Sequence, residues 1–225
     1  MDALECLRLQ LRLEGKDIVR KSLLRQVEFV PGEEMPLMIL ALLPSRELAA
    51  YFDENLSSEL RDELARHIHS LNFPSIDPII AVLKIQNIEV EVGHYKTYLF
   101  PDHYKKSEAD EVKRYPKSDL KIQVFGFGGF TEQIHAIERN RKIVSACVSA
   151  RENDCCGEAW VTTDEDYRRQ GLAQKVVSAW ASDLMKAGKV PFYSHKINNI
   201  GSAKLAKRLG LEPVFEEIVI SHASQ

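Results

Sequence analysis

The sequence predicts a mixed α/β (α+β) fold, in which a mostly antiparallel sheet flanked by helices follows a helix-rich N-terminal half. Three observations predict it: leucines at helical spacing in the first 70 residues, short β-branched runs over 121–163, and a strand, glycine loop and helix over 158–184. A chain of 225 residues suits one or two domains. We predict a boundary between regions 1–115 and 116–225.

The first region is expected to be helical with one or two strands. Leucines and an isoleucine recur at helical steps over 4–11 and 60–68, and Ser57 or Ser58 can cap the second of these helices. Residues 90–100 alternate as a strand does, and they end at Pro101.

The second region begins after residues 102–119, whose mixed charges and proline predict a linker. Turns are expected at Asn140-Arg141 and at 152–154. The strands expected around them are 121–127, 134–139, 143–150 and 158–163.

A glycine loop, Tyr167–Ala173, joins the last of these strands to a helix. Leu172, Val176, Trp180 and Leu184 recur at four-residue steps and make one apolar helical face. Gly171 lies at the junction, where it can turn the chain tightly. A helix that begins this way presents unpaired N–H groups and the positive end of its dipole, which predicts a phosphate site.

The motif Arg168-x-x-Gly171-x-Ala173 resembles the acetyl-CoA loop of the GNAT acetyltransferase superfamily. A second segment supports the resemblance. Ser202, Leu205, Gly210 and Leu211 follow Asn199 as in the superfamily's later Asn-x-x-Ala/Ser…Gly-Phe/Leu signature, after a short strand at 190–194. The resemblance covers residues 121–220 and implies a GNAT-type sheet. Residues 1–115 would then bind the acceptor or form a degenerate copy of the same fold.

The resemblance also implies how acetyl-CoA is held as the acyl donor, without a metal. Pantetheine would pair with main-chain groups of the strand, and pyrophosphate would meet the loop. The implied binding residues are Val161, Thr163, Arg168, Arg169, Gln170, Gly171, Leu172, Ala173, Asn199 and Ser202. Lys204, Lys207 and Arg208 can reach the 3′-phosphate, or they can form a solvated helix face.

A dinucleotide site is the rival interpretation of a glycine loop. It requires Gly-x-Gly-x-x-Gly after the first strand of a βαβ unit, and an acidic residue about 20 residues later. The loop at Gly171 has one glycine and lies late in the chain. Gly126, Gly128 and Gly129 precede no amphipathic helix, so we interpret them as a flexible connection.

Glu158 is the first candidate for a general base that deprotonates an amine. It lies ten residues before Arg168, where some GNAT members carry a strand carboxylate. Strand alternation places it on one face with Trp160 and Thr162, and a neighbouring indole can raise the pKa of a carboxyl group. The alternatives are a surface glutamate, His135 and His195.

One position departs from the family. Many GNAT enzymes carry, seven residues after the asparagine, a tyrosine that protonates the leaving thiolate, and here that position is Ala206. Tyr193 and Ser194 are the nearest hydroxyls and become the candidate acids. The competing interpretation buries Tyr193 in the core.

Composition excludes other classes. A net charge of −3 and a pI near 6.2 argue against nucleic acid as a partner. No apolar run reaches a membrane span, and the acidic N-terminus is unlike a signal peptide, so we expect a cytoplasmic protein. The cysteines Cys6, Cys147, Cys155 and Cys156 lack zinc spacing, and reduced thiols are expected.

The sequence therefore predicts an acyl-CoA-dependent N-acyltransferase that moves acetyl to an amine by direct attack in a ternary complex. The acceptor is expected to be a small-molecule or peptide amine, in a site built from the N-terminal half and Gly126–Phe130. The alternative is a non-catalytic acyl-CoA-binding or regulatory module. The sequence is compatible with a homodimer.

Overall fold

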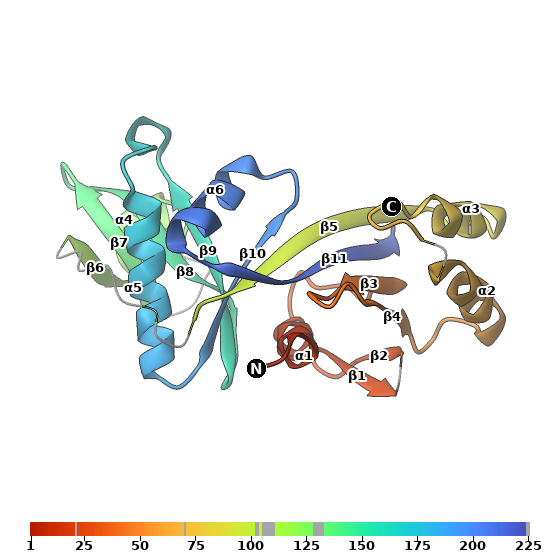
Figure 1. Cartoon of the computed structure of the whole chain (residues 1–225). Helices are drawn as coiled ribbons and strands as arrows, with labels where there is room; N and C mark the ends of the chain where they lie inside the picture. The colour runs from red at the N-terminus through yellow and green to blue at the C-terminus, as the bar shows by residue number, and fades with distance from the viewer. Residues whose placement is uncertain (21, 70, 102–103, 105–110, 128–132, 224–225) are drawn as a thin grey trace. The chain divides into compact units, whose positions relative to one another are not determined.

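The computed structural model describes residues 1–20, 22–69, 71–101, 104, 111–127 and 133–223 (Figure 1). Its contacts divide the chain into two compact units, one of Met1–Thr97 with Pro213–Gln225 and one of Tyr98–Glu212. The units divide the chain earlier than the predicted boundary at residue 115. The last strand also joins the first unit, although it is the end of the chain.

The first unit holds three helices and most of six strands in its described residues. These are α1 (Ala3–Leu13), β1 (Lys16–Arg20), β2 (Leu23–Gln26), β3 (Met38–Leu42), β4 (Leu48–Asp53), α2 (Ser58–Ile68), α3 (Asp77–Ile85), β5 (Val90–Leu99) and β11 (Glu212–His222). The strand order is β1-β2-β4-β3-β11 with β5 beyond β11. The expected helix-rich half is therefore a sheet with helices, as rich in strands as in helices.

Strand β3 shows why the sheet of this unit was not expected. Residues 38–41 are all buried, so the strand is apolar on both faces and has no alternation to reveal it. Its residues pack in a core cluster with Leu64 of α2 and with Ile79 and Leu83 of α3. The predicted helix cap is confirmed, because Ser57 Oγ accepts a hydrogen bond from Leu60 N at 3.2 Å.

The second unit has the predicted mixed, mostly antiparallel sheet. Its elements are β6 (Val112–Pro116), α4 (Leu120–Val124), β7 (Gln133–Arg139), β8 (Lys142–Glu152), β9 (Cys156–Thr163), a 3₁₀ turn (Glu165–Tyr167), α5 (Leu172–Lys186), β10 (Val190–Lys196) and α6 (Ile200–Leu209). The strand order is β10-β9-β8-β7-β6, in which only the β9–β10 pair is parallel. Helix α5 lies along the sheet (Figure 1).

Two predictions in this unit are wrong. Residues 121–127 were expected as a strand, but 120–124 form α4, because Asp119 caps the helix by accepting from Lys121 N at 2.8 Å. Val124 is 89% exposed, so its apolar character had suggested a burial that does not occur. The expected linker at 102–119 contains β6, which pairs with β7.

The parallel pair β9–β10 opens partway along its length. Three rungs join the strands, from Cys156↔Val190 to Glu158↔Phe192. Beyond that rung β9 continues to Thr163 and β10 to Lys196 with no further pairing between them in these fully described segments. Beyond the last rung, the main-chain groups of the two strands no longer pair with each other. A ligand that pairs like a strand requires such an opening.

Candidate functional site

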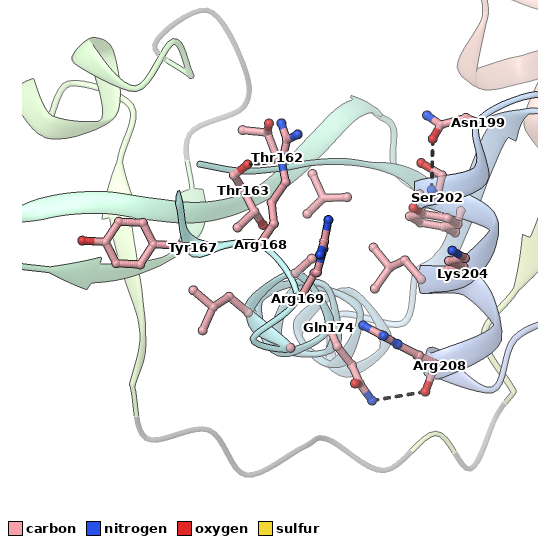
Figure 2. Close-up of a pocket in the computed structure, with 17 residues that line it drawn as sticks. Thr162, Thr163, Tyr167, Arg168, Arg169, Gln174, Asn199, Ser202, Lys204 and Arg208 are labelled. Atoms are coloured by element: carbon pink, nitrogen blue, oxygen red, sulfur yellow. Dashed lines mark hydrogen bonds between the residues drawn. The ribbon is translucent and has the colours of Figure 1, made fainter. Parts of the chain in front are cut away.

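A pocket of about 590 Å³ lies in the second unit, walled by the end of β9, the start of α5 and one side of α6 (Figure 2). It gathers all the predicted binding residues except Gln170, and Tyr193 joins them from β10. Ser194 and Glu158 are not among its lining residues. The pocket is also lined by residues that the donor prediction had not included: Thr162, Tyr167, Gln174, Gly201, Lys204, Leu205 and Arg208. Of these, Lys204 and Arg208 had been considered as contacts for the 3′-phosphate.

Gly171 is the pocket-lining residue at which α5 begins. Its φ is +77°, in the left-handed region that favours glycine, and an added Cβ would meet no atom within 4 Å. Gly171 is the N-cap of α5, and no side chain caps the helix. The first intrahelical bond runs from Lys175 N to the Gly171 carbonyl at 3.2 Å. The N–H groups before Lys175 can therefore serve an anion.

The pocket lining is positively charged. Arg168, Arg169, Lys204 and Arg208 line it, and no carboxylate is among its lining residues. Arg168 forms an ion pair with Glu165 at 3.0 Å, but both side chains are exposed, so solvent screens that pair. In a chain with a net charge of −3, this concentration of cations selects a polyanionic ligand.

The second predicted motif builds a wall of the pocket. Asn199 Oδ1 accepts a hydrogen bond from Ser202 N at 3.0 Å, which makes Asn199 the cap of α6. Gly201, Lys204, Leu205 and Arg208 then recur at helical steps on the pocket side. That spacing was visible in the sequence and could have identified Arg208, whereas Lys207 is not a lining residue.

Tyr193 lines the pocket although it is only 2% exposed. Burial raises the pKa of its phenol to about 12, and a hydrogen bond with Ser202 acts in the opposite direction. Ala206, one helical turn after Ser202, is fully buried in the same core cluster as Tyr193. Tyr193 therefore combines the two interpretations of the sequence, since it is a core residue that also faces the pocket.

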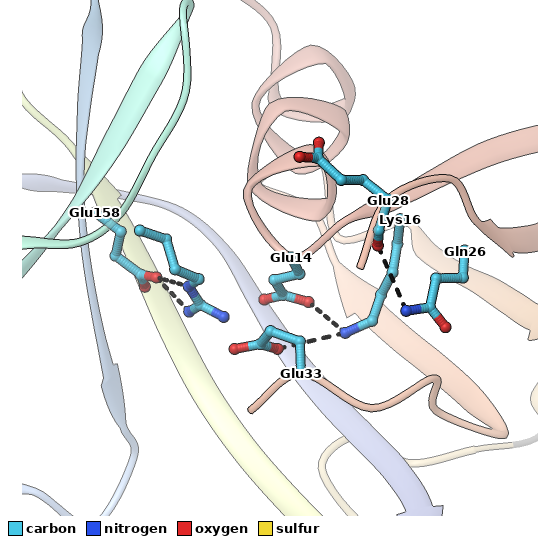
Figure 3. A network of polar contacts seen from close by, with 7 residues as sticks. Glu14, Lys16, Gln26, Glu28, Glu33 and Glu158 are labelled. Atoms are coloured by element: carbon cyan, nitrogen blue, oxygen red, sulfur yellow. Dashed lines mark hydrogen bonds and ion pairs between the residues drawn. The ribbon is translucent and has the colours of Figure 1, made fainter. Parts of the chain in front are cut away.

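Glu158 has a partner that the sequence did not reveal (Figure 3). Arg151 Nε donates to Glu158 Oε2 at 2.9 Å, and Arg151 Nη2 donates to the same oxygen. Glu158 is buried, whereas Trp160, expected beside it on the same face of the strand, is 51% exposed. The carboxylate is therefore held in a buried ion pair.

The two candidate histidines lie in different surroundings. His135 Nε2 is 2.6 Å from Asp183 Oδ2 and lines a separate cavity of about 480 Å³ with Glu152 and Lys189. His195, on β10, is buried and stacks on Tyr98 with ring centroids 5.4 Å apart. Of these two, only His195 shares a strand with pocket-lining Tyr193.

Gly128–Phe130, part of the expected acceptor region, lie outside the described residues. All four cysteines are free thiols, and no group of three or more metal-ligating side chains occurs in the described part of the chain. Among the described helices, none is both long and apolar enough to cross a bilayer.

Comparisons with known proteins agree with this geometry. The family model described as GNAT acetyltransferase matches residues 133–218, which include the whole pocket lining. No curated protein matches the chain by sequence.

Solved structures show a similar fold. A GNAT-family protein from Novosphingobium aromaticivorans aligns with a TM-score of 0.51 and 13% identity over 60% of this chain, and the match spans just under two thirds of that protein (66%). An acetyltransferase of the GNAT family from Colwellia psychrerythraea aligns with a TM-score of 0.50 and 12% identity over 87% of this chain and 84% of its own. At these identities the likeness concerns the fold.

Proposed function

Residues 133–218 place the chain in the GNAT acetyltransferase superfamily, and from that premise we propose that it binds acetyl-CoA and transfers the acetyl group to an amine. The observation that carries the proposal is the pocket at the opening between β9 and β10. It combines an uncapped helix N-terminus at Gly171 with four lining cations and no lining carboxylate. A nucleotide diphosphate with a further phosphate, such as coenzyme A, has the charge that this lining suits.

Each part of coenzyme A has a matching group in the pocket. The pyrophosphate would meet the first N–H groups of α5, with Arg168 and Arg169 beside them. The 3′-phosphate would meet Lys204 or Arg208 of α6. Pantetheine carries amides in an extended chain, so it can pair with main-chain groups of Val161 and Thr163 where β10 no longer pairs with β9.

The reaction is direct acyl transfer. A neutral amine attacks the thioester carbonyl carbon, the C–N bond forms and the C–S bond breaks. The nitrogen gives up one proton as the amide forms, and the thiolate of coenzyme A takes up a proton. We assign the proton that the thiolate takes up to Tyr193, which lines the pocket and whose phenol is protonated at neutral pH, and the proton that the nitrogen loses restores the phenol. Ser194 does not line the pocket, so Tyr193 is the better of the two predicted hydroxyls.

A non-catalytic acyl-CoA-binding module is the second candidate. Two observations favour it. Glu158 is held in an ion pair with Arg151, and the position at which the family carries its tyrosine holds the buried Ala206. Such a module would bind the donor through the same pocket and release no thiol in the presence of any amine.

Two measurements on the same protein separate these candidates. Calorimetry with acetyl-CoA should give micromolar affinity, and donor binding should raise the Tm, because a ligand that binds only the folded state stabilises it. A thiol-release assay with a panel of alkylamines, amino acids and peptide N-termini should then show turnover. Binding without release from any amine would establish the non-catalytic module, and absence of binding would overturn both candidates.

A further inference from the structure

His195 and Tyr98 form a buried pair beside the donor pocket. Within the second unit, the two rings stack with centroids 5.4 Å apart and an interplanar angle of 25°. His195 lies two residues after Tyr193 on β10, so both side chains lie on one side of that strand, and their ring centroids are 6.4 Å apart. Tyr98 shares a core cluster with pocket-lining Tyr193 and Leu172.

The hydrogen bonds fix which nitrogen of His195 carries the proton. Nδ1 lies 2.9 Å from the carbonyl oxygen of Lys196, and a carbonyl oxygen only accepts. Nδ1 must therefore carry a hydrogen, and in the neutral ring Nε2 holds the lone pair. The Tyr98 hydroxyl, 3.3 Å from Nε2, can donate to it.

We propose that His195 is the base that deprotonates the acceptor amine, and that Tyr98 relays the proton to it. The inference rests on the proposed acetyl transfer. The ammonium group of the acceptor gives a proton to the Tyr98 oxygen while the Tyr98 proton moves to His195 Nε2. The free amine then attacks the thioester, and the imidazolium is held by the Lys196 carbonyl and the stacked Tyr98 ring.

The other candidate bases are engaged elsewhere. Glu158 is buried and held in an ion pair with Arg151, whose Nε donates to Glu158 Oε2 at 2.9 Å. His135 is bonded to Asp183 in a separate cavity. The ring of His195 contacts Tyr98 from β5 and Tyr193 from its own strand, and Cys147 of β8 lies beside Tyr193. None of these carries a negative charge at neutral pH, so His195 remains available as an acceptor.

The test compares two acceptors of nearly the same shape. n-Butylamine is an ammonium ion at neutral pH, whereas O-propylhydroxylamine is a free base and needs no deprotonation. His195→Gln should lose about 10²-fold in kcat/KM with n-butylamine and only a few-fold with O-propylhydroxylamine, at unchanged affinity for acetyl-CoA. Tyr98→Phe keeps the stacked ring and should show the same pattern. For both variants the loss with n-butylamine should shrink as the pH rises toward 10, where the amine loses its proton unaided.

His135→Gln is the matched control, because it removes another buried imidazole of the same unit. Any loss it causes should be equal for the two acceptors. An equal loss for both acceptors in His195→Gln with donor affinity retained would overturn the assignment, as would retained turnover in that variant. If the wild type binds acetyl-CoA but acetylates neither these acceptors nor any amine of the panel, the proposed function itself fails.

A second measurement needs neither donor nor acceptor. Nitrogen-15 NMR of the imidazole in the free protein should show the neutral ring protonated at Nδ1, and Tyr98→Phe should shift the Nε2 resonance. A neutral ring protonated at Nε2 would overturn the proposal, because no lone pair would then face Tyr98.

Discussion

The side chain of Gln174 donates from Nε2 to the main-chain carbonyl oxygen of Arg208 at 3.2 Å, which ties the first turn of α5 to the last turn of α6. Both residues line the donor pocket (Figure 2). The bond also satisfies one of the carbonyl groups that a helix C-terminus leaves without an intrahelical partner. It therefore holds two walls of the pocket at a fixed separation, one carrying the loop at Gly171 and the other the cations of α6.

Gln174→Ala should weaken acetyl-CoA binding by about 3–10-fold, because one hydrogen bond that positions both walls is lost. Calorimetry measures the affinity. Gln26→Ala is the matched control, since Gln26 Nε2 makes the same kind of exposed bond to the Glu28 carbonyl in the first unit. Equal affinity in the wild type and the Gln174 variant would show that the bond does not shape the site.

Gly171→Asp should abolish the Tm rise caused by acetyl-CoA, because it places a negative charge against the pyrophosphate. The substitution also forces a side chain into a positive φ, which by itself costs about 1 kcal/mol of stability. Gly188→Asp controls for that cost, since Gly188 has a φ of +75° with open space around it and does not line the pocket. Donor-induced stabilisation that survives in Gly171→Asp would refute the phosphate-loop assignment.

The conformation of the loop at Gly171 could be predicted from sequence because its information is local. The uncapped start of α5 needs only Gly171 and the helix that follows it, and the Asn199 motif needs only three residues to cap α6. The ion pair of Glu158 with Arg151 could not be predicted in this way, because it depends on how two strands pair. A register shift in β8 between Ser149 and Arg151 brings Arg151 opposite Glu158, and no pattern along either strand encodes that pairing.

The same contrast between local and long-range information explains why the sheet of the first unit was not predicted. Its central strand β3 is buried on both faces and pairs with β11, nearly 180 residues later in the sequence. A short apolar run of this kind cannot be distinguished from a helix by periodicity. The role expected for this region in acceptor binding stays a prediction.

Glu158→Gln should lower stability by about 1–3 kcal/mol, because Arg151 loses its charged partner where Glu158 is buried. Turnover per folded molecule should change only a few-fold if His195 is the base. Denaturant unfolding and a thiol-release assay on the same samples measure both quantities. Glu54→Gln breaks an exposed pair with Arg25 and should shift the Tm less. A loss of about 10²-fold in turnover in a fully folded variant would indicate that Glu158, and not His195, is the base.

Tyr193→Phe should lower turnover while leaving acetyl-CoA affinity nearly unchanged, because it removes the proposed acid and keeps the buried ring. The defect should shrink with an acyl donor whose thiol is more acidic, since such a thiolate leaves without a proton. Ser194→Ala, the neighbouring hydroxyl that does not line the pocket, should have little effect on turnover. If Tyr193→Phe turns over like the wild type with every donor, the thiolate leaves without help from this side chain.

Ala206→Tyr should destabilise the protein and not restore the family's acid. Ala206 is fully buried in the core cluster that contains Tyr193 and Leu209, so a phenol ring there overpacks the core at a cost of about 1–3 kcal/mol. Denaturant unfolding gives the cost. A variant as stable as the wild type with raised turnover would show that the α6 position still reaches the thioester.

Asp183 should make the stability of the second unit sensitive to acid. Burial pushes the pKa of Asp183 upward, but hydrogen bonds from His135 and Arg114, at 2.6 and 2.7 Å, and their charges bring it below its ordinary value. A carboxyl group whose pKa is lower in the folded state stabilises the fold above its unfolded pKa, about 3.9, and loses that contribution as the pH falls through the folded value.

Asp183→Asn keeps an oxygen that can accept these bonds but has no charge to titrate. The wild type should be the more stable of the two at pH 6, and the difference in free energy of unfolding should narrow as the pH falls below about 4. Denaturant titrations at a series of pH values measure that difference directly. A difference that stays constant down to pH 2 would mean that the Asp183 charge does not contribute to the stability of the fold.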